Sequence, residues 1–221
     1  MKTIIVTGGI GAGKSMVCAE FAKFGAKVIE GDKIGHDCLA PDGAAYAETV
    51  AEFGNEILNA DKTISREKLG RIAFADKQRL AKLNEITHKH ILREIVEQID
   101  KVRQKCHTIS QDANDNFLAD LVCDKRHCVP MIVLEIPLFR VVDIPHDAVI
   151  SVIASDSLRV ERVIERNGLP EDVIASIMAR QPTNEEYRSF ADYCIENEGN
   201  IDALLAQARE VYEKINKGMN I

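Results

Sequence analysis

The first fifteen residues contain the clearest chemical pattern in the chain. Residues 8–15 read GGIGAGKS, which fits the phosphate-loop pattern G-x-x-x-x-G-K-[ST]. Glycines let such a loop turn successive backbone N–H groups toward phosphate oxygens, and the helix that follows adds its positive N-terminal end. In this pattern Lys14 reaches the β- and γ-phosphates, and the Ser15 hydroxyl ligates Mg²⁺. We therefore expect a nucleotide and Mg²⁺ site, in which the nucleotide contacts Gly9, Ile10, Gly11, Ala12, Gly13, Lys14 and Ser15.

A glycine-rich turn between a strand and a helix could also exist without any ligand. The flanking residues argue against that alternative, because an apolar run at 4–6 precedes the loop and residues 16–22 have helical spacing. The loop pattern and its strand–helix context therefore agree.

Three carboxylates stand just after apolar runs. Glu30 and Asp32 follow a short run at 27–29, and Glu135 closes a run at 131–134. Ligands of parallel α/β sheets bind at the carboxyl ends of the strands, so these acids stand where acceptor chemistry could occur. Asp32 could orient and deprotonate an acceptor hydroxyl, or merely cap the next helix. Glu135 stands where a phosphate-loop enzyme places a second carboxylate that organises Mg²⁺.

Basic residues suited to phosphate occur later in the chain. Arg159, Arg162 and Arg166 stand at helical spacing after an apolar run at 148–154. Such a row is usual for a solvated helix face, but it also suits a lid over a triphosphate, because a guanidinium binds phosphate through two parallel hydrogen bonds. His88 could hold a phosphate or a carbonyl group if it faces a cleft, although a helical histidine is usually structural or solvated.

Some cysteines and histidines in the segment 106–130 are candidate metal ligands. Their spacing fits no standard zinc pattern, so we expect a long, irregular surface connection there instead. The candidates are Cys106, His107, Cys123, His127 and Cys128.

The composition is that of an ordinary globular protein. The 221 residues are 46% hydrophobic and 29% charged, with a formal net charge of −7. This charge argues against broad binding to nucleic acids or membranes, and no apolar run is long enough to span a bilayer. We expect no cleaved signal, because the N-terminal strand leads into the phosphate loop, and the six scattered cysteines suggest free thiols in a reducing cytoplasm. No feature indicates an oligomeric state.

Alternating apolar runs and helical patterns predict an α/β fold, with a three-layer α/β/α core of the phosphate-loop NTPase type around a parallel sheet. The region 41–105 is mostly helical and too long for a simple crossover, so we expect an inserted acceptor-binding subdomain. The predicted core therefore comprises 1–38 and 131–221, with a lid at about 156–182, and the insert comprises 39–130.

Several motifs, in order along nearly the whole chain, resemble those of the dephospho-CoA kinase family. Residues 7–15 (TGGIGAGKS) are similar to its T-G-G-I-G-S-G-K-[ST] motif, and residues 28–32 (VIEGD) to its V-[IV]-D-A-D motif. Residues 135–138 (EIPL) resemble D-I-P-L, 162–166 (RVIER) resemble the lid motif R-x-x-x-R, and 195–199 (IENEG) resemble [IL]-[DE]-N-x-G. Gln181 stands where the family has a glutamine after the lid.

The resemblance implies transfer of the ATP γ-phosphate to the ribose 3′-hydroxyl of dephospho-CoA, the last step of CoA biosynthesis. It implies a parallel-sheet core, a helical CoA-binding domain and a lid, with ATP and Mg²⁺ as cofactors. The implied catalytic residues are Asp32, Lys14 and Arg162. The implied nucleotide contacts beyond the loop are Arg162, Arg166 and Asn197. The implied acceptor contacts are Asp32, His88, Glu135, Pro137 and Leu138.

The chain departs from the family pattern at several positions. Glu30 and Glu135 replace aspartates, Lys89 follows His88 where proline is common, and 106–128 resembles extra sequence. These departures suggest a divergent member and leave other acceptors open, such as a nucleoside, a nucleotide or a sugar.

A regulatory nucleotide binder is a further alternative. It would be expected to carry a guanine motif of the N-K-x-D type in the later strands, and the chain has none there. An inactive homologue is a last alternative. It is disfavoured because Lys14, Ser15, Asp32 and Arg162 are all present.

Overall fold

The computed structural model describes residues 1–112, 131–137 and 144–218, without the side chains of 105–112. The chain divides into two compact units, which we call unit 1 (Met1–Glu30 and Lys101–Ile221) and unit 2 (Gly31–Asp100). We expected division after residues 38 and 130 instead. The division differs because helix α2 (Gly31–Cys38) begins directly after strand β2 (Lys27–Glu30) and belongs to unit 2. One long helix, α5 (Lys77–Asp112), also continues across the boundary between Asp100 and Lys101.

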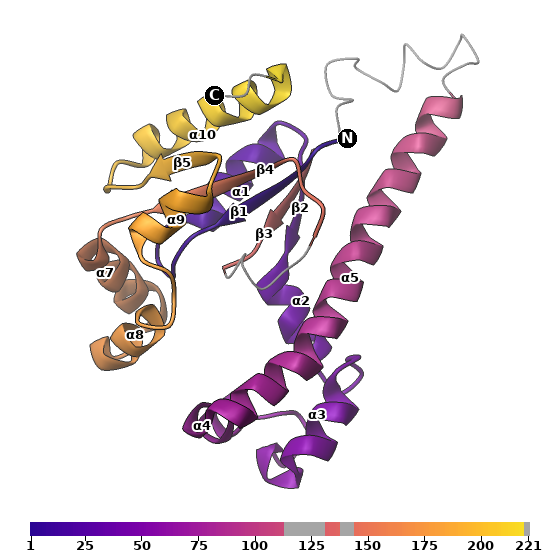
Figure 1. Ribbon diagram of the computed structural model, residues 1–221, viewed down its shortest axis with the longest axis vertical. Coiled ribbons are helices and arrows are strands. Elements are labelled where there is room, and N and C mark those ends of the chain that lie inside the picture. Colours follow the sequence, from indigo (N-terminus) through magenta and orange to yellow (C-terminus); the bar gives the residue numbers. More distant parts are fainter. Residues whose placement is uncertain (113–130, 138–143, 219–221) are drawn as a thin grey trace. The chain divides into compact units, whose positions relative to one another are not determined.

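Unit 1 is built on a parallel sheet, as predicted. The described residues form five strands in the order β2-β3-β1-β4-β5 (Figure 1). All neighbouring strands are parallel, so their carboxyl ends share one edge of the sheet. The three central strands read as apolar runs because both faces of such a sheet are covered there. The described strands are β1 (Thr3–Thr7), β2 (Lys27–Glu30), β3 (Ile132–Glu135), β4 (Ala148–Ile153) and β5 (Tyr193–Glu196).

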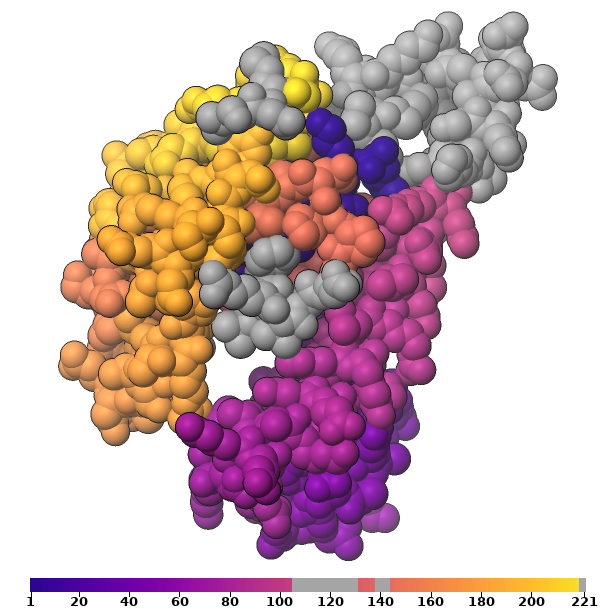
Figure 2. Space-filling view, viewed as in Figure 1, coloured from indigo at the N-terminus to yellow at the C-terminus, as the bar shows by residue number. Residues whose placement is uncertain are grey.

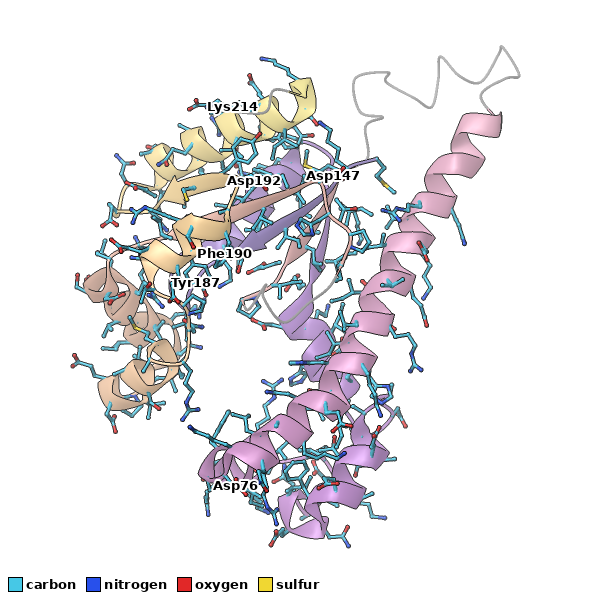
Figure 3. The ribbon with its side chains drawn as sticks, in the orientation of Figure 1. Asp76, Asp147, Tyr187, Phe190, Asp192 and Lys214 are labelled. Atoms are coloured by element: carbon cyan, nitrogen blue, oxygen red, sulfur yellow. The ribbon has the colours of Figure 1, made fainter. Side chains whose placement is uncertain are left out.

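Two carboxylates hold the start of the central strands. Asp147 Oδ2 accepts a hydrogen bond from the N–H of Thr3 at 2.7 Å, and Asp192 Oδ2 accepts one from the N–H of Val149 at 2.7 Å. Figure 3 labels both aspartates, which lie just before β4 and β5. They satisfy backbone donors that the parallel ladder leaves over at the strand ends.

Helices α1 (Lys14–Lys23) and α10 (Ile201–Lys217) pack together on the sheet. The ring of Phe21 meets that of Tyr212 edge-on, with the ring centroids 5.2 Å apart. Side chains of both helices share one buried cluster with those of β1, β3 and β4. This layer fixes the direction in which α1 leaves the loop after β1.

Three further helices follow β4: α7 (Asp156–Asn167), α8 (Glu171–Met178) and α9 (Asn184–Phe190). Ser155 occupies the N-cap position of α7, and Asp156 is the first helical residue. Helices α8 and α9 form one continuous orange surface in Figure 2.

Helix α9 follows Pro182 and was not predicted, because a proline usually ends a helical pattern at the preceding residue. Thr183 and Glu186 nevertheless form a capping box, which is a recognisable start signal. Tyr187 and Phe190 lie one turn apart on α9 (Figure 3), with ring centroids separated by 5.6 Å.

Unit 2 is mainly helical, as predicted for the region after β2. The side chain of Ser65 accepts a hydrogen bond from the N–H of Lys68 and caps α4. Helix α5 continues to Asp112, into the stretch that we expected to be irregular, and its residues up to Asp100 belong to unit 2. The elements are α2 (Gly31–Cys38), α3 (Tyr46–Phe53), the 3₁₀ helix η1 (Asn55–Ile57), α4 (Arg66–Ala75) and α5 (Lys77–Asp112).

Among the described helices, none combines the length and the apolar character that a bilayer crossing requires.

Candidate active site

The phosphate loop connects β1 to α1 in unit 1, between Thr7 and Lys14. Gly13 is the N-cap of α1 and has a φ of +103°, in the range that favours glycine. A Cβ atom at Gly13 would collide with the side-chain amide of Asn197. Glycine is therefore required here both by the backbone conformation and by the neighbouring amide.

The ammonium group of Lys14 lies over the first residues of this loop. Its Nζ donates to the carbonyl oxygens of Gly8 at 3.0 Å and Gly9 at 3.1 Å. This position keeps a positive charge beside the loop, at the start of a helix whose dipole also favours anions. The arrangement suits the predicted contact with phosphate.

Ser15 and Glu135 bring two oxygen atoms that could ligate a metal together at the carboxyl edge of the sheet. Ser15 lies in the first turn of α1 and Glu135 ends β3, and the serine Oγ donates to the glutamate Oε1 at 2.8 Å. Hydroxyl and carboxylate oxygens are hard ligands, which suit Mg²⁺. Among the described residues no group of three His, Cys, Asp or Glu side chains could hold a metal. Mg²⁺ fits the pair nonetheless, because it is usually held by one or two protein ligands together with phosphates and water.

Two neighbours set the surroundings of Glu135. Glu30 is its partner in the β2–β3 register, so both acids stand at the same edge. Cys18 lies one turn after Ser15 on α1 and is buried. Burial raises the pKa of the Cys18 thiol well above its usual value, and the negative charge of Glu135 acts in the same direction. The thiol therefore stays protonated, and we did not single it out from the sequence.

Arg162 and Asn197, both predicted to contact the nucleotide, hold the outside of the loop. Arg162 Nη1 donates to the carbonyl of Gly11 at 3.4 Å, and Nη2 donates to the carbonyl and Oδ1 of Asn197 at 3.0 and 3.2 Å. The buried Asn197 in turn donates from Nδ2 to the carbonyl of Ala12 at 2.8 Å. These contacts link α7 and the end of β5 to the loop.

Arg159 and Gln181 contact the tip of the loop, at Ile10. Arg159 is only 3% exposed, and its Nε donates to the carbonyl of Ile10 at 3.0 Å. The Oε1 atom of Gln181 accepts from the N–H of Ile10 at 2.8 Å and from Arg159 Nη2 at 3.0 Å. Arg159 Nη1 also donates to Asp156 Oδ1 at 2.9 Å. Our site prediction omitted Arg159 and Gln181, although helical spacing placed Arg159 in the arginine row and the family resemblance pointed to Gln181.

The remaining predicted residues of unit 1 are placed differently. Arg166 Nε donates to Asn167 Oδ1, its neighbour in the chain, at 2.8 Å. The carbonyl of Pro137 accepts from the Tyr187 hydroxyl at 3.0 Å, and burial raises the pKa of Tyr187 to about 12. Leu138 lies outside the described residues. The acceptor role of Pro137 and the nucleotide role of Arg166 stay predictions.

Asp32 and His88 belong to unit 2. Asp32 lies in the first turn of α2, which begins at Gly31, so it is not the cap of that helix. His88 lies on α5, where burial lowers its pKa. Their acceptor roles stay predictions. The side chains of the candidate metal ligands in 106–130 lie outside the described part of the chain.

Comparison with known proteins identifies the family. The family model described as dephospho-CoA kinase matches residues 2–112 and 120–203. A dephospho-CoA kinase from Thermobifida fusca is 31% identical over 100% of this chain and 99% of its own length. One from Ralstonia nicotianae is 35% identical over 94% of this chain and 95% of its own.

Solved structures share the fold. A protein from Thermus thermophilus superposes with a TM-score of 0.70 at 24% identity, covering 97% of each chain. A dephospho-CoA kinase from Campylobacter jejuni gives a TM-score of 0.57, also at 24% identity and 97% coverage of each chain. With a family model matched over most of its length, and with relatives above 30% identity that it covers almost completely, this chain belongs to the dephospho-CoA kinase family.

Proposed function

We propose that this protein transfers the γ-phosphate of ATP to the ribose 3′-hydroxyl of dephospho-CoA, which completes CoA. The observation that carries the proposal is the pairing of Ser15 with Glu135 beside Lys14, on a phosphate loop in a chain of this family. The pair supplies oxygen ligands where a phosphoryl-transfer site needs a divalent cation. The sequence departs from the family at Glu135, but the carboxylate still reaches the serine.

In this proposal the residues of the loop hold and polarise the nucleotide. The loop N–H groups and Lys14 would bind the phosphates, and Ser15 with Glu135 would hold Mg²⁺. A bound Mg²⁺ would supply positive charge that offsets the charge of the phosphates. Arg162 holds the loop carbonyl of Gly11 and is close enough to the loop to contribute a positive charge there.

Asp32 is the proposed partner of the acceptor. Its carboxylate orients the ribose 3′-hydroxyl and takes its proton as the 3′-oxygen forms a bond to the γ-phosphorus. The bond between that phosphorus and the β–γ bridging oxygen breaks, and ADP leaves. His88 and Pro137 are proposed to contact the acceptor.

We also propose a cytoplasmic location. Cys18, Cys38 and Cys194 are free thiols in the structure, which suits a reducing compartment. The net charge of −7 supports small-molecule partners rather than nucleic acid.

A coupled ADP-release assay tests the activity. Purified protein with ATP and Mg²⁺ is offered dephospho-CoA, adenosine, shikimate and gluconate in parallel. We expect turnover with dephospho-CoA well above the others, and ³¹P NMR of the product should show a 3′-phosphomonoester. Preferential turnover of another acceptor would reject the assignment while retaining a small-molecule kinase.

A further inference from the structure

Three consecutive carbonyl groups of the phosphate loop accept hydrogen bonds from side chains outside the loop. The donors come from α7 and from the end of β5, so the loop is held by distant parts of unit 1. The pairs are Arg159 with Ile10, Arg162 with Gly11, and Asn197 with Ala12.

The contact from Arg159 has a consequence for the next N–H group. In a planar trans peptide, the C=O of one residue and the N–H of the next point in opposite directions. By holding the carbonyl of Ile10, Arg159 therefore directs the N–H of Gly11 away from the guanidinium. Gly11 has a φ of +74°, in the left-handed region that glycine adopts without steric cost. N–H groups of such loops are the ligands for phosphate.

The preceding peptide is held as well. Gln181 accepts from the N–H of Ile10, so the carbonyl of Gly9 points away from Gln181. That carbonyl accepts from the N–H of Ala12 at 3.3 Å and from Lys14 Nζ at 3.1 Å. The peptide before Ile10 is thus held at both its N–H and its carbonyl, and the peptide after Ile10 is held at its carbonyl. Because Arg159 also donates to Gln181, the three residues Ile10, Gln181 and Arg159 close a ring of hydrogen bonds.

Arg159 is buried, unlike an arginine that extends through solvent to reach a phosphate. Its side chain is 3% exposed, and its guanidinium donates to Ile10, Gln181 and Asp156. A Cβ atom at Gly9 would collide with this guanidinium, so the loop backbone lies directly against it. Burying a guanidinium is costly unless its donors are satisfied, and this one is committed to the loop and its supports.

We propose that Arg159 is a positioning residue for nucleotide binding: with Gln181 it holds both peptide groups of Ile10, and so keeps the phosphate loop in its binding shape. Arg159 acts through the backbone of the loop and does not touch the substrate. This inference deepens the proposed function and rests on it, because it assigns the step at which Arg159 acts to the binding of ATP.

The test compares four single variants of the full-length protein. Arg159→Met removes every hydrogen-bond donor of the side chain, and Arg159→Lys keeps the charge without the guanidinium fork. Gln181→Ala removes the oxygen that accepts from both Ile10 and Arg159, and Gln181→Glu keeps a side-chain oxygen there. Arg188→Ala is the matched control, because Arg188 forms a half-exposed ion pair with Glu196. The measurements are the Kd of Mg²⁺–ATP without acceptor, the KM values of both substrates, and the ¹H–¹⁵N amide signals of Ile10 and Gly11.

We expect Arg159→Met to raise the Kd of ATP by about tenfold, the loss expected for charge-assisted hydrogen bonds. Arg159→Lys should fall between that variant and wild type, because an ammonium keeps the charge but lacks the planar fork whose three nitrogens reach Ile10, Gln181 and Asp156. The KM for dephospho-CoA should stay within about twofold, since the acceptor is not bound by the loop. The amide signals of Ile10 and Gly11 should shift in the free protein, and Arg188→Ala should leave all these values unchanged.

Wild-type ATP affinity and an unshifted Gly11 signal in Arg159→Met would overturn the proposal. Should that variant not fold, the glutamine pair decides. Weaker ATP binding in Gln181→Ala with recovery in Gln181→Glu supports the ring, and wild-type binding in Gln181→Ala overturns it. Failure of the proposed function is distinct, because wild-type protein would then not phosphorylate dephospho-CoA, while the amide signals would still report on Arg159.

Discussion

The hydroxyl of Ser15 donates a hydrogen bond to the carboxylate of Glu135 across 2.8 Å, joining the first turn of α1 to the end of β3. Strands β1 and β3 are direct neighbours in the sheet, and Val6 pairs with Glu135 in their register. The phosphate loop therefore places Ser15 at the edge of the sheet where β3 ends with Glu135. The contact shows that a glutamate at this position reaches the serine.

The first prediction concerns the requirement for Mg²⁺. Glu135→Gln keeps the shape of the side chain but removes its negative charge, so it should weaken a divalent cation site. We expect the Mg²⁺ concentration for half-maximal activity to rise by about tenfold, as for loss of one charged ligand partner. Glu135→Asp, which keeps the charge on a shorter side chain, should shift it less. A Mg²⁺ titration of initial rates measures this, and coincident curves for Glu135→Gln and wild type would contradict the assignment.

The second prediction concerns Lys14. Lys14→Ala removes the ammonium that lies over the loop, and with it a charge that stabilises the transferring phosphoryl group. Turnover should fall by roughly 100-fold or more. Lys23→Ala is the control, because Lys23 ends the same helix and is largely exposed. Near-normal turnover by Lys14→Ala, at an unchanged melting temperature, would remove the lysine from the reaction.

The third prediction separates backbone strain from the special surroundings of Gly13. Gly13 and Gly218 both have positive φ values, +103° and +69°, but a Cβ atom meets Asn197 only at Gly13. Gly218→Ala should cost about 1 kcal/mol of stability through left-handed backbone strain alone. Gly13→Ala should cost more and should also weaken ATP binding. Thermal unfolding and the Kd of ATP measure both effects, and equal losses in the two variants would contradict the role of Asn197.

The sheet could be predicted from the sequence because its central strands β1, β3 and β4 are short apolar runs bounded by polar residues or glycine. The loop and the acids at the strand ends followed from the same pattern. Helix α9 was missed because Pro182 drew attention away from the capping box that begins at Thr183. The capping-box signal was present in the sequence, but the helix-breaking signal of Pro182 was the stronger of the two.

The arginines of α7 show a feature of the site that the sequence alone did not predict. Arg159 and Arg166 stand three and four positions from Arg162, so both share its helix face. In the structure Arg159 is buried against Ile10, whereas Arg166 donates to Asn167. The difference depends on how α7 packs beside the loop, which is a tertiary property. Helical spacing alone treats the two residues as equivalent.

The fourth prediction concerns pH and the stability of the fold. Burial lowers the pKa of His88 below its ordinary value of 6.5. At a pH between the lowered pKa of the folded state and the ordinary value of 6.5, the unfolded chain binds more protons than the folded one. The free energy of unfolding should therefore fall as the pH drops below 6.5. His88→Gln cannot titrate and should show a flatter dependence there. Urea unfolding across this range compares the two proteins, and parallel curves would show that His88 does not contribute.

The last prediction concerns Asp32, which distinguishes a kinase from a protein that only binds ATP. Asp32 stands two residues after the end of β2 and lies in the first turn of α2, where a negative charge is also favourable to the helix dipole. Asp32→Asn keeps the size of the side chain but removes its charge and most of its basicity. We expect kcat with dephospho-CoA to fall by roughly 100-fold or more, as for loss of a positioned general base.

Two controls accompany Asp32→Asn: its affinity for ATP, and the activity of the variant Glu30→Gln. ATP affinity should change little in Asp32→Asn, because Lys14, Ser15 and Glu135 remain. Glu30→Gln removes the acid that ends β2 and should have a smaller effect on kcat if Asp32 is the base. In a loose transition state much of the benefit of the carboxylate comes from orienting the hydroxyl, so the loss should persist at high pH rather than being rescued there. If Asp32→Asn transfers phosphate at a near-normal rate and Glu30→Gln does not, the acceptor-facing carboxylate is Glu30, and Asp32 contributes only to the start of α2.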